Sequence, residues 1–206
     1  MAKIKTVNKT AEPVKEKKTF MEILCGIWIF AILFLQPLYF QDAYADILTA
    51  KYGFLLVADG VLLAGFIAWA IMGKKIGPYF ENIKEQGLWN YIKSTFSVLD
   101  YFVLGFLLIS IISTLQSYPY MYSAFFGNEG RWDGMITIGF YCISYFIISR
   151  NMKFKKSYVI LFLISSLIVA LWAITDFFDW NIIGFKTYMS QDHYRVFVST
   201  IGNIDT

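Results

Sequence analysis

Five long apolar stretches constrain the fold of this chain more than any other feature of its sequence. A helix needs roughly 17–25 apolar residues to cross a hydrocarbon core of about 30 Å. The stretches that meet this length cover residues 23–40, 54–73, 97–115, 132–149 and 157–175. Polar segments that contain Gly, Pro and Asn separate them, as is typical of loops. We therefore predict an all-α fold, a polytopic transmembrane helical bundle with about five spans.

The composition supports lipid as the solvent of these stretches. Hydrophobic residues make up 57% of the chain and charged residues 16%, against about 45–50% and about 25% in a soluble domain. A soluble fold of this length leaves roughly 30% of the unfolded chain's surface exposed, which is too much to hide so apolar a sequence. The basic residues do not gather on one soluble face, so we expect membrane lipids and no nucleic acid as partners.

The basic residues also predict how the chain is oriented, because Lys and Arg near span ends stay in the cytoplasm. Most of the 18 lie in three alternate segments, residues 1–19, 74–96 and 150–156. We therefore predict the N-terminus inside and the C-terminus outside. The expected domains are a basic cytoplasmic tail at 1–19, a membrane domain at 20–176 and an extracytoplasmic segment at 177–206.

The second polar segment has helical periodicity of its own. Apolar residues recur at Phe80, Ile83, Leu88 and Ile92, with charged residues between them. This spacing predicts one amphipathic helix between Pro78 and Phe96 that lies in the cytoplasmic interface. Its role is open between a support parallel to the membrane and a helix that docks a partner.

The third polar segment ends in a glycine-rich run with a single arginine. Gly127 and Gly134 flank it and allow close backbone approach, and Arg131 stands where the expected fourth span begins. A guanidinium near the N-terminus of a helix is a physically sensible anion site. The alternative is that Arg131 pairs with Glu129 or Asp133 and only anchors the interface.

Other ionisable residues give weaker signals. Asp59 lies inside the second expected span, where it either reaches outer water or a neighbouring helix, or lines a polar cavity. Asp100 is expected to be interfacial. His193 is either an acid or base or a surface residue. Two Cys and one His are too few for a Cys/His zinc site, and no soluble-enzyme motif is present, so we expect no metal and no cofactor.

Two segments resemble the O-antigen ligase and O-antigen polymerase family. The run from Gly127 through Arg131-Trp132-Asp133-Gly134-Met135 resembles the "G…R-x-(E/D)-G-(L/M)" segment of that family. The tail Tyr194-Arg195-Val196-Phe197-Val198-Ser199-Thr200-Ile201-Gly202-Asn203 looks like its second element, "R-x-x-(G/S)-T-(F/I)-G-N". Both fall on the outer side of the predicted topology, in the order and separation of the family. The family often has Asn-Pro-Asn where this chain has Asn203-Ile204-Asp205.

The resemblance implies a multi-pass glycosyltransferase of a bacterial cell membrane that needs no metal. Such a protein moves a glycan from an undecaprenyl-pyrophosphate carrier, a lipid-linked oligosaccharide donor, to a glycan or lipid acceptor outside the membrane. Arg131 and Arg195 would match the arginines that hold the donor's pyrophosphate. We expect this sequence to be an N-terminal portion of a larger protein, because the family's long outer loop normally follows. The alternative is a non-enzymatic scaffold or assembly partner of an envelope polysaccharide system.

Overall fold

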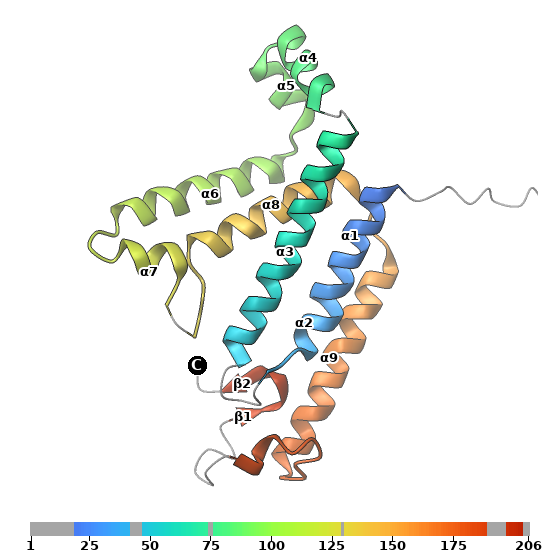
Figure 1. Cartoon of the computed structure of the whole chain (residues 1–206), viewed down its shortest axis with the longest axis vertical. Coiled ribbons are helices and arrows are strands. Elements are labelled where there is room, and N and C mark those ends of the chain that lie inside the picture. The colour runs from blue at the N-terminus through green and yellow to red at the C-terminus, as the bar shows by residue number, and fades with distance from the viewer. Residues whose placement is uncertain (1–18, 42–46, 74–75, 129, 189–196, 204–206) are drawn as a thin grey trace, which may run out of the picture.

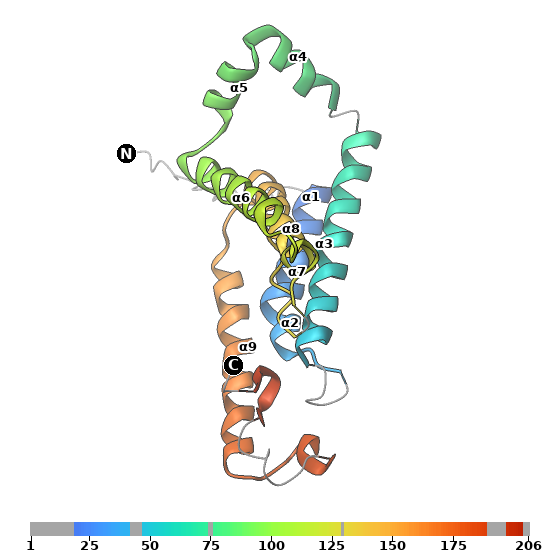
Figure 2. The same cartoon turned by 90° about the vertical axis from the view of Figure 1, so that its left-hand side faces the viewer.

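The structure is a computed structural model that describes residues 19–41, 47–73, 76–128, 130–188 and 197–203. Three long helical segments run side by side along its long axis (Figures 1 and 2). The first is continuous over Phe20–Leu38 and consists of α1 (Phe20–Phe30), a π-helical turn (Ala31–Leu35) and α2 (Gln36–Leu38). The other two are α3 (Ile47–Met72) and α9 (Lys156–Phe177).

Local sequence signals place the starts of two helices. The Thr19 hydroxyl accepts a hydrogen bond from the Glu22 N–H at 3.2 Å, and the Glu22 carboxylate accepts one from the Thr19 N–H at 3.0 Å. Ser97 and Asp100 form the same reciprocal cap at the start of α6 (Val98–Gln116). Each cap satisfies two backbone donors that a helix start otherwise leaves without partners.

The π-helical turn in the first span has a proline just after it and a serine opposite it. Pro37 has no N–H to donate to the carbonyl of Leu33, four residues earlier. The buried Ser165 hydroxyl of α9 donates to that carbonyl at 2.7 Å instead. A hydroxyl from the neighbouring helix thus supplies the donor that the proline cannot give, and it fixes α9 against the first span.

A second group of helices crosses the first at a steep angle. It contains α6, the short α7 (Met121–Phe126) and α8 (Met135–Asn151), and α6 and α8 pack against each other in opposite directions (Figure 1). The chain from Trp132 to Asn151 meets α3 at successive points. Trp132 bonds to Thr49, Ser144 bonds to Asp59, and Asn151 shares a cleft with Trp69. This segment therefore follows α3 from its first turns to its last.

Four of the described helical segments are long and apolar enough to cross a membrane, where the sequence predicts about five spans. These four are Phe20–Leu38, Ile47–Met72, Val98–Gln116 and Lys156–Phe177. The remaining expected span, residues 132–149, corresponds to α8, which has 17 residues and is therefore about 25 Å long. It is short because the loop that precedes it occupies residues up to Gly134, the N-cap of α8.

The interfacial helix expected between Pro78 and Phe96 is two helices. They are α4 (Ile76–Gln86) and α5 (Leu88–Thr95), and Gly87 between them has φ of 77°. A residue with positive φ cannot continue a right-handed helix, and glycine adopts that conformation without a steric cost. The amphipathic pattern continues across this break, which is why periodicity alone predicts one helix.

The last described part of the chain returns to the bundle. After a 3₁₀ turn at Phe185–Tyr188, strands β1 (Phe197–Val198) and β2 (Gly202–Asn203) pair antiparallel around a second 3₁₀ turn, Ser199–Ile201. This hairpin packs on α9 and α2, at the end of the bundle where α3 begins (Figures 1 and 2).

The buried apolar core is small and lies where α1, α3 and α8 meet. It consists of Met21, Cys25, Leu62 and Ile147. Most large apolar side chains on the long helices point outward and are exposed. A chain that exposes this much apolar surface suits lipid rather than water. The fold is therefore an all-α polytopic helical bundle, with one short hairpin among its described residues.

Candidate functional site at the start of helix α3

The loop between α7 and α8 is closed at its neck by two glycines. A Cβ at Gly127, where φ is 88°, would lie 2.7 Å from the Asp133 backbone N, and one at Gly134 would lie 2.2 Å from the Gly127 N. Only residues without a side chain allow this crossing. The close backbone approach expected from the sequence is confirmed, and it brings the two ends of the loop together.

Trp132 attaches this loop to the first turns of α3. Its indole N–H donates to the Thr49 hydroxyl at 3.3 Å, and its ring stacks on Tyr52 with centroids 5.1 Å apart and planes 3° apart. The Thr137 hydroxyl donates to the Trp132 carbonyl at 2.6 Å. These contacts of Trp132 fix the position of the loop over α3.

Arg131 is exposed beside this anchor. Within the described part of the chain, its guanidinium takes part in no ion pair or hydrogen bond, although Asp133 is only two residues away; Glu129 lies outside the described residues. The helix that follows has no side-chain cap at Gly134, so no capping side chain satisfies its first N–H groups. Arg131 is a cation whose five N–H donors remain available for a ligand.

The hairpin of β1 and β2 is attached to the same turns of α3 by a lysine. The Lys51 ammonium donates to the Thr200 carbonyl, and at 3.3 Å to the Pro37 carbonyl, while the Thr200 hydroxyl also donates to Pro37. Lys51 and Thr200 are 149 positions apart in the sequence. A lysine has three N–H donors, so Lys51 has one left for a further acceptor.

Buried polar groups fix the hairpin from the other side. The Asp176 carboxylate, 2% exposed at the end of α9, accepts from the Ser199 backbone N–H at 2.7 Å. The buried Lys186 ammonium donates to the Asp176 carbonyl at 2.5 Å and to the Asp179 carboxylate at 3.1 Å. Ser199 has φ of 45°, and Thr200 is fully buried. The Ser-Thr pair of the second motif therefore has a structural role in holding the turn.

A cleft of about 450 Å³ opens beside the first turns of α3. Its lining combines polar groups with an apolar floor: Tyr39, Gln41, Thr49, Ala50, Gly53, Phe54 and Val57. Small-molecule sites typically occupy about 300–1,000 Å³ and have a few polar groups on an apolar wall. The cleft has the size and lining of such a site, next to the two anchored segments.

Parts of the two motif segments singled out in the sequence are thus attached to one stretch of α3, from Thr49 to Tyr52, through residues on different faces of that helix. Of the residues predicted to form the site, Arg131 lies there, whereas Arg195 and His193 lie outside the described residues. Lys51, the residue that attaches the second segment, is not apparent from the sequence. It counts there only as a single basic residue in an outer loop.

Asp59 lies away from this site, inside the bundle and 1% exposed. Its Oδ1 accepts from the Trp28 indole N–H and from the Ser144 hydroxyl, both at 2.8 Å, and its Oδ2 has no partner in the described part of the chain. The interpretation that Asp59 reaches neighbouring helices is correct, because it joins α1, α3 and α8.

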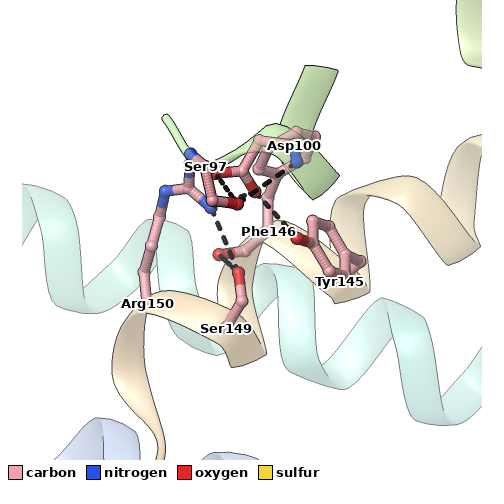
Figure 3. Close-up of polar contacts among 6 residues, drawn as sticks. All are labelled: Ser97, Asp100, Tyr145, Phe146, Ser149 and Arg150. Carbon is pink, nitrogen blue, oxygen red and sulfur yellow. Dashed lines mark hydrogen bonds and ion pairs between the residues drawn. The ribbon is translucent and has the colours of Figure 1, made fainter. Parts of the chain in front are cut away.

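Asp100, in the first turn of α6, is buried and forms a second polar cluster (Figure 3). It accepts from the Tyr145 hydroxyl at 2.8 Å and pairs with Arg150 at 3.3 Å. The sequence gives no sign of this pair, because the two residues are 50 positions apart.

The described residues contain no group of three or more His, Cys, Asp or Glu that could hold a metal ion. Comparisons of this chain with protein families, with curated proteins and with solved structures find no match.

Proposed function

We propose that this chain belongs to a membrane glycosyltransferase that binds the pyrophosphate of a lipid-linked oligosaccharide where α3 begins, and transfers its glycan to an acceptor sugar. One observation carries the proposal. The loop with Arg131 and the hairpin with Ser199 and Thr200 are attached to the same turns of α3. Each segment of the family resemblance therefore contacts the first turns of α3, which supports a common site.

The chemistry of transfer needs cations at this location. When a glycan leaves a pyrophosphate carrier, negative charge develops on the leaving phosphate, and fixed N–H donors stabilise that charge most when they are placed in advance. Arg131 offers a guanidinium with no partner among the described residues, on a loop that glycines and Trp132 hold in place. Arg195 precedes β1 by two positions and would supply the second guanidinium. A bidentate arginine suits a phosphate better than a lysine does.

The cleft beside Thr49 fits the neutral part of the substrate. Its apolar floor of Phe54 and Val57 suits the first isoprene units of the carrier, and the hydroxyl and amide groups of Thr49 and Gln41 suit a sugar. The proposed orientation puts this end of the bundle outside the cell, where such a transfer takes place.

Binding of the spent carrier tests the proposal without knowledge of the glycan. Full-length protein is titrated with undecaprenyl pyrophosphate and with undecaprenol, and the affinity of each is measured. We expect the pyrophosphate form to bind more tightly, and R131A and R195A each to lose about tenfold or more of that preference, because each removes a charged hydrogen bond. K84A, an exposed lysine on α4, is the matched control and keeps the preference.

Glycan transfer in cells is the second measurement. R131A and R195A are expected to abolish transfer while the protein still inserts in the membrane. Full transfer and unchanged carrier binding in both variants would rule out the donor-binding roles. That result would favour the scaffold alternative, for which the exposed aromatic and aliphatic residues Phe80, Leu88 and Trp89 on α4 and α5 offer a docking face.

A further inference from the structure

A second cleft, of about 440 Å³, lies between α3 and α8 at the end of the bundle opposite the proposed donor site. Six of its lining residues are apolar and two are polar: Leu63, Phe66, Trp69, Ile143, Phe146, Ile147, Arg150 and Asn151. Its volume is within the usual range for bound small molecules. The cleft is thus lined mainly by apolar side chains, with one guanidinium and one amide group among them.

The cation is held rigidly by its neighbours (Figure 3). The Arg150 guanidinium donates to both carboxylate oxygens of Asp100, at 3.3 and 3.4 Å, and to the Ser149 hydroxyl at 3.1 Å. It also lies over the rings of Phe96 and Phe146, 5.2 and 4.7 Å from their centroids. The Arg150 side chain remains 34% exposed, so the guanidinium is fixed in place and still reaches solvent or lipid.

The surroundings of Arg150 are positively charged. Lys153, Lys155 and Lys156 follow within six residues and are exposed, whereas Asp100 is buried against Arg150. The pair of Arg150 and Asp100 is neutral, so the three lysines leave a net positive charge at this end of the cleft. An anionic group at the rim would meet favourable charge and donors.

We propose that this cleft binds one anionic phospholipid, with its phosphate at Arg150 and the nearby lysines and an acyl chain along Leu63, Phe66 and Ile147. Charge complementarity selects the headgroup, and the apolar lining selects the chain. The bound lipid would contact both α3 and α8. The inference is independent of the proposed transferase activity.

Native mass spectrometry tests the proposal directly. Purified protein in neutral detergent is titrated with dioleoyl-phosphatidylglycerol or with dioleoyl-phosphatidylcholine, which have the same acyl chains. We expect one phosphatidylglycerol to remain bound in preference to phosphatidylcholine. Each basic residue near a lipid surface contributes about a fivefold effect on anionic lipid binding, so R150Q should lower the preference by about fivefold.

Two further comparisons separate lipid binding from loss of structure. D100N/R150Q removes the buried carboxylate together with its partner, and it should lose the preference as R150Q does while it avoids an unpaired buried charge. I143W fills the cleft and should abolish retention of both lipids. Ile168 on α9 has the same 39% exposure as Ile143 but lies outside the cleft, so I168W should bind as the unmodified chain does.

Three results would overturn the proposal. The first is equal retention of the two lipids by the unmodified chain. The second is phosphatidylglycerol binding by I143W as strong as by I168W. The third is a dimer that I143W abolishes and I168W keeps, which would assign the cleft to a second copy of this chain.

Discussion

At the scale of single residues, a few side chains that the sequence leaves inconspicuous decide how the segments meet. Lys51 joins a proline carbonyl of the first span to the hairpin near the end of the described chain. Asp59 joins three helices through one carboxylate oxygen. Each acts over a long sequence separation, so no local pattern could have predicted its partner.

The glycine neck at the α7–α8 loop gives a sharp prediction. G134A should lower the free energy of unfolding of the purified protein by about 1–3 kcal/mol. It should also weaken carrier binding, because the new Cβ would lie 2.2 Å from the Gly127 backbone N. Backbone atoms cannot move aside as a flexible side chain does. Thermal unfolding in detergent and the carrier titration measure the two effects.

G139A is the matched control for this prediction. Gly139 lies in α8 with open space around the position of a Cβ. Alanine favours a helix over glycine by up to about 1 kcal/mol, so G139A should be neutral or stabilising. Equal effects of the two substitutions would show that the neck is not closely packed.

At the scale of elements, the sequence predicts helices well and their ends less well. Apolar length alone places α1 to α2, α3, α6 and α9 within a few residues, apart from the α3 start, which comes seven residues earlier than predicted. The helical turns before the predicted start contain Thr49 and Lys51. Because these residues are polar, a search for apolar runs does not include them in the helix. Gly87 divides the interfacial segment because of its backbone conformation, which amphipathic spacing does not reveal.

The bond from Ser165 to Leu33 predicts a coupling between two helices. S165A should destabilise the protein by about 0.5–1.5 kcal/mol, because the Leu33 carbonyl loses a donor that Pro37 cannot replace. In a P37A background a backbone N–H becomes available, so the same substitution should cost less. A double-mutant cycle on thermal unfolding measures the difference.

P37A is suitable for this cycle because the Pro37 carbonyl, which accepts from Lys51 and Thr200, is retained in alanine. S166A, on the same helix one position later, serves as the control because no hydrogen bond of its side chain links the helices in the described structure. Additive losses in the cycle would mean that the serine does not compensate for the proline.

At the scale of the whole molecule, the described basic residues are divided between the two ends of the bundle. Helices α4 and α5 and the end of α8, which carry Lys84, Lys93 and Arg150, lie towards one end, and the start of α3 and the α7–α8 loop, which carry Lys51 and Arg131, lie towards the other (Figure 1). The end with more basic residues is predicted to face the cytoplasm. The proposed donor site and the proposed lipid site would then lie on opposite sides of the membrane.

Cysteine accessibility tests this orientation. K84C and K153C should react with a membrane-impermeant maleimide only after the cells are permeabilised, and N128C should react in intact cells. The two native cysteines, Cys25 and Cys142, are buried and should give a low background. The unmodified chain measures that background. Labelling of N128C and K153C from the same side would contradict the predicted topology.

The sequence predicts the class of fold because hydrophobic length is a property of single segments. It predicts Arg131 as a cation where a helix begins, because glycines and a charge mark that loop. It does not predict the contact between this loop and α3, since Trp132, Thr49 and Tyr52 come from distant segments. The steep crossing of α8 over α3 is likewise a result of packing.

The π-helical turn at Ala31–Leu35 has a consequence for sequence variation. Such a turn contains one residue more than the regular α-helix would. Removal of one residue from it would restore regular α-helical winding and leave the residues after it at nearly the same rotation, because the extra residue is accommodated within the turn itself. The Pro37 carbonyl would then still face Lys51 and Thr200, so a one-codon deletion in this turn should leave the hairpin attached.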